Sequence, residues 1–375
     1  MRKYAAIILS AGYSSRMNDF KPLMNIYGKT PLERNISLFK NSGIKNIYIV
    51  AGYQWERIKD FVGNEAEVIY NKDFSEGMLS SVKVCLRNLT QWLEDFFLLP
   101  VDIPSVKSNT IKQTMDKYEI GNYTVVYPIF SQRRGHPPLI STVIAKDILE
   151  YNGLGGLRNI LSLYEERSTD VQLADRGILL DMDVEEDYKV ILKYILNYPY
   201  PDDLECLEMM RLCGMKKETI AHMKCVGELS KIIAVELNDK GHKVDADLAY
   251  RGGLLHDIGK GKENHAKEGA LMVKEFGYPC LFEVINEHMN IDELEDIKEK
   301  EIVYISDKLI KGIRPVSLEE RFRFSFYKYR NYPEIMDNIK RRFYMAKKIK
   351  MRIENIIGHD IEQIQEELWK DLYIL

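Results

Sequence analysis

The stretch LSAGYSSRMNDFKPL, from Leu9 to Leu23, is the most informative segment in the first half of this 375-residue chain. It directly follows an apolar, β-rich run that begins at Tyr4. Its glycine and small hydroxyl residues let the backbone turn sharply, so that N–H groups can converge on a phosphate oxygen. Arg16 and Lys21 add positive charge suited to a triphosphate. A Gly-Ser turn alone is more often a surface loop, but the added cations favour a phosphate-binding loop.

Outward from this loop, short apolar runs alternate with segments of helical spacing. The runs typical of strands are Tyr4–Leu9, Asn46–Ala51, Glu67–Tyr70, Phe96–Pro100 and Thr124–Pro128. Helical spacing is found over Leu32–Asn41, Trp55–Phe61 and Leu79–Leu89. This β–α alternation predicts an α/β, Rossmann-like fold with a mostly parallel sheet and helices on both faces. Ligands of such sheets bind beyond the carboxyl ends of the strands, so we expect the chemistry in the loops that follow strands.

The second half of the chain has a different character. Pro199 and Pro201 interrupt a helical run, and Asp202 with Asp203 is suited to cap a new helix. From there the pattern is helical, with apolar residues at a spacing of three and four. We therefore expect two domains, an α/β domain over residues 1–197 and an all-helical domain over residues 201–375.

Composition and charge argue against some classes of function. The net charge of −4 gives no pull toward nucleic acid or anionic membranes. No stretch approaches the roughly 18–20 apolar residues that span a bilayer, so we expect a soluble protein. Five cysteines without a CxxC pair are typical of reduced thiols in a cytoplasmic protein. Residues 321–352 are basic and aromatic, but aromatics at helical spacing more often pack a bundle, so nucleic acid is not an expected partner.

The Leu9–Leu23 stretch resembles the signature loop of the MobA/MocA-type nucleotidyltransferases, L-x-(A/G)-G-x-S-x-R-M-G-x-x-K. It departs from that pattern at Asn18, where the family usually has glycine. The resemblance implies that this loop binds a nucleoside triphosphate, with Arg16 and Lys21 in catalytic roles. The implied nucleotide contacts in the loop are Leu9, Ser10, Ala11, Gly12, Ser14, Ser15, Arg16 and Lys21.

Further segments resemble the family in the same order. Residues 98–104, LLPVDIP, resemble its strand-end D-x-P element, which implies that Asp102 is a catalytic residue and an Mg²⁺ ligand. Residues 181–187, DMDVEED, resemble its D-x-D-T-x-E-D segment, which makes Asp183 the second Mg²⁺ ligand and Asp181 its close competitor. Residues 71–82 resemble an element that contacts base and ribose through Asn71, Gly77, Met78 and Ser80. A G-H-P segment near the acceptor site corresponds to Gly135, His136 and Pro137.

The resemblance implies attack by an acceptor phosphate on an NTP, with release of pyrophosphate. Cytidylyl enzymes of the family tend to have the sequence L-A-A-G in this loop, whereas guanylyl enzymes tend to have L-A-G-G. Ser10-Ala11-Gly12 of this chain resembles the cytidylyl pattern. The expected substrates are therefore CTP and molybdopterin (molybdenum cofactor), with a molybdoenzyme as a candidate recipient of the product. The alternative is transfer to a sugar phosphate or another small phosphate.

The helical half carries a set of histidines and aspartates. An adjacent His256-Asp257 pair in an apolar segment needs compensation, which a divalent cation shared with His222 and Asp307 would supply. The arrangement resembles the H…HD…D motif of the HD superfamily of metal-dependent phosphohydrolases. His265 and His288 match histidines that bind a second metal in some HD domains. His256, Asp257 and Lys260 would be catalytic, with Mn²⁺, Fe²⁺, Ni²⁺ or Co²⁺ bound. The rival hypothesis is a regulatory binding module that gates the transferase.

Overall fold

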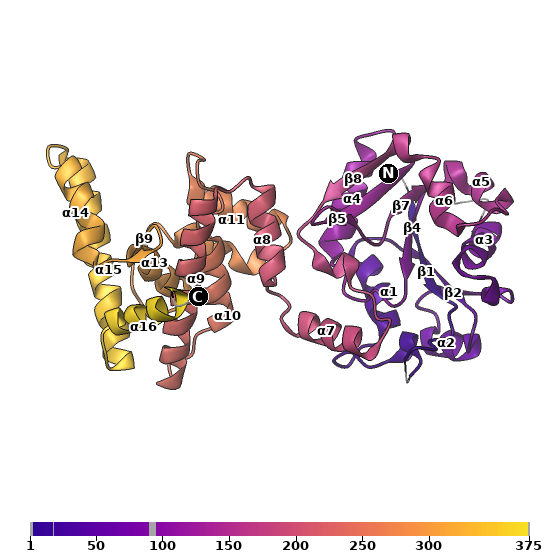
Figure 1. Cartoon of the computed structure of the whole chain (residues 1–375), viewed down its shortest axis with the longest axis horizontal. Helices are drawn as coiled ribbons and strands as arrows, with labels where there is room; N and C mark the ends of the chain where they lie inside the picture. The colour runs from indigo at the N-terminus through magenta and orange to yellow at the C-terminus, as the bar shows by residue number, and fades with distance from the viewer. Residues whose placement is uncertain (1–2, 18, 90–94, 374–375) are drawn as a thin grey trace. The chain divides into compact units, whose positions relative to one another are not determined.

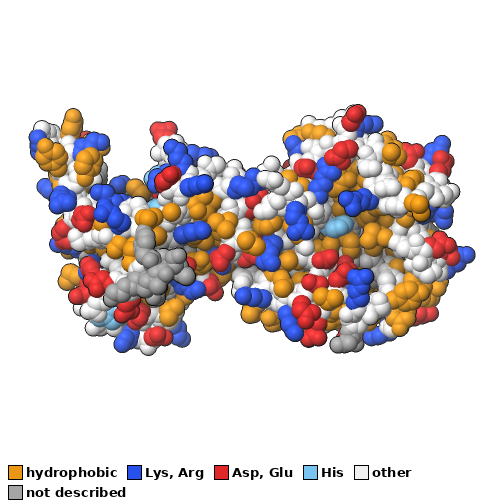
Figure 2. Space-filling model, viewed as in Figure 1, with side chains coloured by type: hydrophobic (Ala, Val, Ile, Leu, Met, Phe, Trp, Pro, Cys, Tyr) orange, Lys and Arg blue, Asp and Glu red, His pale blue; other side chains and the backbone are white. Residues whose placement is uncertain are grey.

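The computed structural model describes residues 3–17, 19–89 and 95–373, so Asn18 lies outside the described residues. The chain forms two compact units, Met1–Tyr198 and Pro199–Leu375 (Figure 1). Lys, Arg, Asp and Glu side chains are interspersed over the face drawn in Figure 2, as the small net charge leads one to expect. Within the described ranges, no helix combines the length and apolar character needed to cross a membrane.

The first unit is built on an eight-stranded sheet with the order β3-β2-β1-β4-β7-β5-β6, in which β8 also pairs with β5. The parallel part joins β1 to β2 and β4, and β2 to β3, whereas β7 runs antiparallel to β4 and β5. The strands are β1 (Tyr4–Ser10), β2 (Asn46–Ala51), β3 (Glu67–Tyr70), β4 (Asp95–Pro100), β5 (Val125–Phe130), β6 (Arg133–Arg134), β7 (Leu139–Ser141) and β8 (Ser168–Gln172). The expected mostly parallel sheet is confirmed, and β6, β7 and β8 extend it beyond the five predicted strands.

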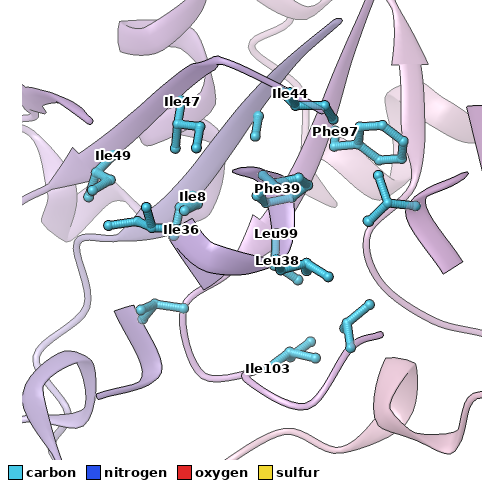
Figure 3. Packing of buried hydrophobic residues seen from close by; sticks show 14 of the residues in the cluster. Ile8, Ile36, Leu38, Phe39, Ile44, Ile47, Ile49, Phe97, Leu99 and Ile103 are labelled. Atoms are coloured by element: carbon cyan, nitrogen blue, oxygen red, sulfur yellow. The ribbon is translucent and has the colours of Figure 1, made fainter. Parts of the chain in front are cut away.

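Helices cover both faces of this sheet, because successive side chains of a strand point to opposite sides. Ile8 of β1 packs in one core beneath α1 (Pro31–Asn41), α2 (Trp55–Val62) and α4 (Ser108–Glu119), part of which is drawn in Figure 3. Ile7 and Leu9 belong to the opposite core. The helices of that face are α3 (Met78–Leu89), α5 (Ala145–Glu150) and α6 (Gly156–Ser162).

The carboxyl ends of β1 and β4 open toward the same edge of the sheet. Val101 N donates to Leu9 O at 2.9 Å directly after β4, which brings the two following loops together. The last helix of the unit, α7 (Glu185–Leu196), begins after an acidic segment, and Asp187 accepts the N–H groups of Asp183 and Val184. A carboxylate at a helix N-terminus satisfies otherwise unpaired donors.

The second unit is a helical bundle. Asp202 caps its first helix, as expected, by accepting the Glu205 N–H at 2.8 Å. Its helices are α8 (Asp203–Leu212), α9 (Lys217–Asp239), α10 (Ala246–Leu255), α11 (His265–Glu275), α12 (Phe282–Glu287), α13 (Glu299–Lys308), α14 (Leu318–Lys328), α15 (Pro333–Ile357) and α16 (Ile361–Tyr373).

One feature of this unit differs from a purely helical expectation. A short antiparallel hairpin, β9 (Ile310–Lys311) and β10 (Arg314–Pro315), follows α13. Gly312 adopts φ +64° at its turn, a conformation that favours glycine. Strands of two residues carry too little alternation to be found from the sequence pattern.

Candidate active sites

A pocket of about 250 Å³ lies at the carboxyl edge of the N-terminal sheet. It is lined by Leu9, Ser10, Ala11, Gly12, Ser14, Lys21, Pro22, Phe74, Gly77, Met78, Ser81, Pro100, Val101 and Asp102. The structure therefore brings the loop after β1, the loop before α3 and the end of β4 to one cavity. Ser15, Arg16, Asn71 and Ser80, which we also expected near the nucleotide, are not among the lining residues.

Lys21 is the centre of charge in this pocket. Its Nζ lies 2.8 Å from Oδ1 of Asp183 and 3.6 Å from Oδ2 of Asp102. The side chain is only 11% exposed, so its orientation is set by these carboxylates rather than by solvent. Its backbone N–H donates to Ser14 Oγ at 3.1 Å, and Ser14 adopts φ +56°. The loop between β1 and η1 (Lys21–Leu23) therefore folds back so that Lys21 faces the end of β4.

The two aspartates near Lys21 differ in electrostatic environment. Burial raises the pKa of Asp102, and the Lys21 ammonium opposes that shift. A hydrogen bond from Lys21 lowers the pKa of Asp183, and Arg16 lies 3.4 Å from the same carboxylate. Asp181 is exposed, and no hydrogen bond to its side chain occurs among those of the described residues. Asp102 and Asp183 therefore both face the Lys21 ammonium group, and carboxylate oxygens are ligands suited to Mg²⁺.

Asn71 stabilises two of the segments that surround the pocket. It is fully buried, and its amide donates to Ser80 Oγ at 2.8 Å and Ser81 Oγ at 3.0 Å. Its carbonyl oxygen accepts the Asp73 N–H at 3.0 Å. The side chain thus ties the loop after β3 to the first turn of α3. Ser81, which sequence reasoning did not single out, lines the cavity while Ser80 bonds to backbone carbonyls.

Phe74 is a second lining residue that the motifs did not indicate. Its ring lies 5.0 Å from the exposed ring of Tyr13, which in turn lies 5.5 Å from Tyr53. A Cβ on Gly52 would come within 2.5 Å of the Phe74 ring, so this close packing requires glycine. Nothing in the local sequence joins these rings, because they come from three different loops.

The G-H-P segment lies between β6 and β7. His136 is partly buried, its pKa is lowered by burial, and its Nδ1 is buried with no hydrogen-bond partner in the described part of the chain. His136 N donates to Ile178 O at 2.9 Å, and the bond to Pro137 is cis. The neighbouring Arg134 is held by Glu165 and Asp170. Arg134 is thus engaged within the fold, and Arg133 is exposed beside it.

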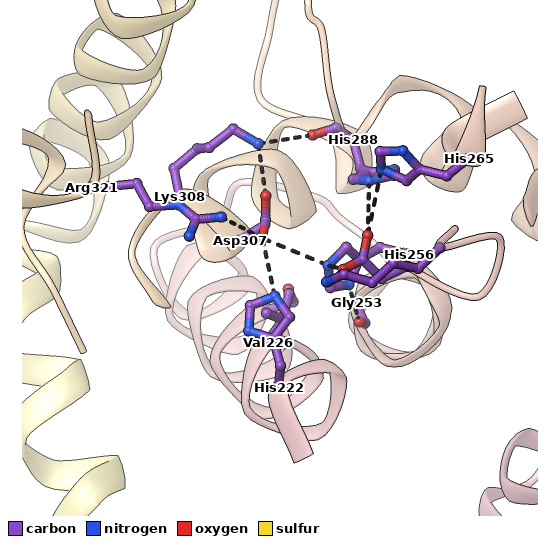
Figure 4. Close-up of polar contacts among 12 residues, drawn as sticks. His222, Val226, Gly253, His256, His265, His288, Asp307, Lys308 and Arg321 are labelled. Carbon is purple, nitrogen blue, oxygen red and sulfur yellow. Dashed lines mark hydrogen bonds and ion pairs between the residues drawn. The ribbon is translucent and has the colours of Figure 1, made fainter. Parts of the chain in front are cut away.

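The second unit gathers four histidines at one place. His222 of α9, His256 at the end of α10 and His288 at the end of α12 are buried, and His265 begins α11. Neighbouring rings lie 5.0 to 5.3 Å apart (Figure 4). Close packing of α9 on α10 permits this, since a Cβ on Gly253 would lie 2.8 Å from Gly227 Cα.

Backbone carbonyls fix the orientation of three of these rings. The Nδ1 atoms of His222, His256 and His288 lie 2.9, 2.8 and 2.6 Å from the carbonyl oxygens of Gly312, Gly253 and Ile285. A carbonyl only accepts, so each Nδ1 donates its N–H to the carbonyl and Nε2 is the ring nitrogen left to bind a metal. The Nε2 atoms of His256 and His288 are buried without a hydrogen-bond partner among the described residues. Buried, unsatisfied lone pairs with fixed tautomers are what a metal site requires.

Two aspartates complete this centre. Asp307 Oδ1 lies 3.2 Å from His222 Nε2 and 3.6 Å from His256 Nε2, and Asp257 Oδ2 lies 3.8 Å from His256 Nε2. Two sets have ligand atoms within 4.8 Å of one another, namely His222-His256-Asp307 and His256-Asp257-His288. Although burial opposes ionisation, His256 and Lys260 lower the pKa of Asp257 to about 2. The donor set therefore fits a divalent transition metal.

His265 lies at the margin of the centre. Its Nε2 is 3.5 Å from Asp257 Oδ1, but it belongs to neither of the two sets. A cavity of about 400 Å³ opens on the centre and is lined by Glu218, Thr219, His222, Asp257, Lys260, His265, Met289, Asp307, Gly312 and Arg321. Lys308, in contrast, is buried and bonds to Asp307 Oδ2 and the His288 carbonyl.

Comparison with known protein families gives one match in each of the two structural units. The MobA-like NTP transferase domain family matches residues 6–171, and the HD domain family matches residues 219–312. The uncharacterized protein MJ0778 of Methanocaldococcus jannaschii is 28% identical over 147 residues, 34% of this chain and 86% of its own length. The bifunctional protein GlmU of Staphylococcus haemolyticus is 27% identical over 116 residues, 30% of this chain and 26% of that protein.

Among solved structures, an Rv0371c homologue from Mycobacterium sp. strain JC1 has 20% identity and a TM-score of 0.47, covering 52% of this chain and 98% of its own. The match to GlmU, described above, spans only about a quarter of the length of that protein. The two family matches fall on the two structural units that carry the Lys21 pocket and the histidine centre. The chain accordingly combines a MobA-like nucleotidyltransferase domain with a following HD domain.

Proposed function

We propose that the N-terminal domain, residues 1–197, transfers CMP from CTP to a phosphorylated acceptor, with molybdopterin as the acceptor. An acceptor phosphate oxygen attacks the α-phosphorus of CTP; the bond to the bridging oxygen breaks and pyrophosphate leaves. The triphosphate would occupy the pocket after β1, within reach of Lys21 and Arg16. Mg²⁺, held by Asp102 and Asp183, would neutralise phosphate charge when bound.

The Lys21 cluster is the observation that supports this proposal. A buried ammonium group between two carboxylates supplies fixed charge that needs no reorganisation during the reaction. In the bound state the ammonium group would contact phosphate oxygens while the carboxylates hold the metal. Arg16 is 73% exposed and can turn toward a nucleotide without breaking a buried contact. In phosphoryl transfer the protein acts mainly by positioning the substrates and neutralising the charge of the phosphate groups.

The preference for CTP rests on Ala11. This residue lines the pocket and is nearly buried, so its methyl group restricts the space near a bound base. A smaller pyrimidine is expected to fit this space better than a purine. The test supplies the purified chain with Mg²⁺, molybdopterin and each of the four NTPs, and measures pyrophosphate. A preference for GTP would contradict the proposal, and Ala11→Gly should weaken any preference for CTP.

The acceptor is proposed to bind near Gly135, His136 and Pro137. Arg133, exposed beside this segment, offers positive charge for an acceptor phosphate. The alternative acceptor is a sugar phosphate or another small phosphate. Both share the attacking phosphate oxygen, so the same pyrophosphate assay distinguishes them when the acceptor is exchanged. Turnover with sugar phosphates and none with molybdopterin would favour the alternative. If molybdopterin is the acceptor, a molybdoenzyme is the expected recipient of the product.

For the HD domain, residues 201–375, we propose metal-dependent hydrolysis of a phosphate ester. His222, His256, Asp257 and Asp307 would hold one divalent transition metal such as Mn²⁺, Fe²⁺, Ni²⁺ or Co²⁺, and His265 with His288 would contribute to a second. Such a metal, when bound, supplies Lewis acidity toward a phosphoryl oxygen. Lys260 reaches the same cavity as a mobile point charge, because its side chain is half exposed.

The rival function is a regulatory module that binds metal or ligand and controls the transferase. The two hypotheses differ in what His256→Ala and Asp257→Ala should change. Loss of phosphate release from nucleotides or from the transferase product, with unchanged transfer, would favour hydrolysis. Altered control of transfer, with no hydrolysis by the parent chain, would favour regulation. His242→Ala is a suitable control, because this histidine bonds to the Ile297 carbonyl outside the centre.

A further inference from the structure

Arg321 is a charged residue at the HD centre to which the resemblance assigned no role. It lies in the first turns of α14, after the segment matched by the HD family, and it lines the 400 Å³ cavity. We propose that Arg321 and Lys260 form a metal-dependent anion site that binds a phosphoryl group. The inference deepens the proposed phosphohydrolase function of the HD domain and rests on it for the class of ligand.

The two cations are each paired with a different carboxylate of the centre. Arg321 Nη2 lies 3.4 Å from Asp307 Oδ1, and Lys260 Nζ lies 2.6 Å from Asp257 Oδ2. Both side chains are partly exposed, at 30% and 51%. They therefore have room to move toward the cavity without leaving a buried donor unsatisfied.

Charge balance links these cations to the metal. Asp307 Oδ1 is also within 3.6 Å of the two histidine Nε2 atoms that form a ligand set with it. A divalent cation there would compete with Arg321 for the same oxygen and repel the guanidinium. Arg321 and Lys260 would then carry positive charge that Asp307 and Asp257 no longer neutralise, and a bound anion would replace these carboxylates as their partner, although Glu218 also lines the cavity. Anion affinity is therefore expected to depend on metal.

The shape of the cavity indicates what kind of anion fits. Among the described residues that line it there is no Phe, Tyr or Trp, and Thr219 adds a hydroxyl group. A planar guanidinium group can engage two oxygens of a phosphoryl group at once, and Lys260 adds a point charge. The lining thus suits recognition of the phosphoryl group itself, because the residues described there include no large aromatic ring on which a nucleobase could stack.

The experiment measures binding of inorganic phosphate to the full chain by isothermal titration calorimetry, with Mn²⁺ loaded and after chelation. All proteins carry Lys21→Met, so that the transferase pocket contributes little. Arg321→Gln and Lys260→Gln are compared with Arg323→Gln and Lys262→Gln, two exposed cations near them that do not line the cavity. Metal content is determined by elemental analysis, and CMP is titrated in parallel.

Phosphate should bind the Mn²⁺-loaded chain and lose most of its affinity after chelation. Arg321→Gln and Lys260→Gln should each weaken phosphate binding roughly 10- to 100-fold with metal content retained, because each removes one charge-assisted contact. The two control variants should stay within about twofold, and CMP should bind about as tightly as phosphate. Unchanged affinity in Arg321→Gln would overturn the proposal.

Loss of metal in Arg321→Gln would also overturn it, because Arg321 would then support Asp307 rather than an anion. Much tighter binding of CMP than of phosphate would contradict recognition of the phosphoryl group alone. Metal- and Arg321-dependent phosphate binding by a chain that hydrolyses no phosphate ester would uphold the anion site. In that case only the hydrolytic function proposed above would fall.

Discussion

Lys21 Nζ donates a 2.8 Å hydrogen bond to Asp183 Oδ1, joining residues 162 positions apart in the chain. Lys21 follows the loop after β1, whereas Asp183 precedes α7 at the far end of the same unit. The contact holds the acidic segment over the end of β4, where Asp102 lies. The electrostatics of the pocket therefore depend on the folding of the whole N-terminal unit, because Lys21 and Asp183 come from opposite ends of it.

Replacing Lys21 by Met should reduce nucleotidyl transfer strongly. The change removes the buried ammonium group that faces both aspartates, and loss of one preorganised electrostatic contact typically costs roughly 10²- to 10³-fold in kcat. Pyrophosphate release under saturating NTP measures the effect. Lys29→Met, at an exposed lysine outside the pocket, should retain at least half of the activity. A Lys21→Met enzyme with near-parental kcat would exclude this role.

Asp183→Asn and Asp181→Asn should separate the two candidates for the second Mg²⁺ ligand. Asp183 faces Lys21 and Asp102, but Asp181 is exposed to solvent. We expect Asp183→Asn to lose transfer about 100-fold and Asp181→Asn to change it by less than about threefold. Activity as a function of Mg²⁺ concentration is the readout. The reverse order of the two variants would assign the metal to Asp181.

Asn71→Ala should destabilise the N-terminal domain. It leaves the buried hydroxyl group of Ser81 and the partly exposed hydroxyl group of Ser80 without their donor, at a cost of about 1–3 kcal/mol in the free energy of unfolding. Because Ser81 lines the pocket, KM for the NTP should rise as well. Chemical denaturation and steady-state kinetics measure the two effects. Asn88→Ala, at an exposed helix position, is the matched control. Equal stability of the two variants would show that the hydrogen bonds of Asn71 to Ser80 and Ser81 do not stabilise the domain.

Metal removal should lower the thermal stability of the HD domain. His256 belongs to both sets of candidate ligands, so His256→Ala should abolish tight metal binding, whereas His265→Ala should keep at least one ion per chain. A metal that binds only the folded state raises the unfolding temperature, and that shift should vanish in His256→Ala. Elemental analysis and thermal unfolding with and without chelator test both points. Two ions per chain in the parent would indicate a binuclear centre.

Glu301 should make the HD domain less stable as pH rises. Burial raises the pKa of its carboxyl group, Glu287 acts in the same direction, and Lys300 together with the Lys298 and Glu301 backbone amides opposes it. Below the unfolded-state pKa the group is protonated in both states and contributes no difference. Above its raised native pKa, ionisation penalises the folded state. Glu301→Gln should therefore raise the unfolding temperature more at pH 7 than at pH 4, and an equal shift at both pH values would contradict this.

The strands and helices around the phosphate loop were predictable because their apolar periodicity is local. β2 and β3 begin and end where the pattern places them, and β1 and α1 differ by one residue. β6 and β9 were not predictable, since two residues carry no periodicity. Asp102, His256 and Asp257 could be singled out as candidate site residues from short motifs, because their neighbours in sequence define their setting.

Residues that meet only in space could not be identified in this way. Phe74 and Arg321 reach their cavities from positions to which no motif assigned a role, and the buried amide of Asn71 turns to the serines of α3 rather than into the pocket. Local periodicity and motifs set which elements form and where charge is concentrated along the chain. Folding alone set which charges face each other, because contacts such as Lys21–Asp183 and Arg321–Asp307 depend on packing between distant elements.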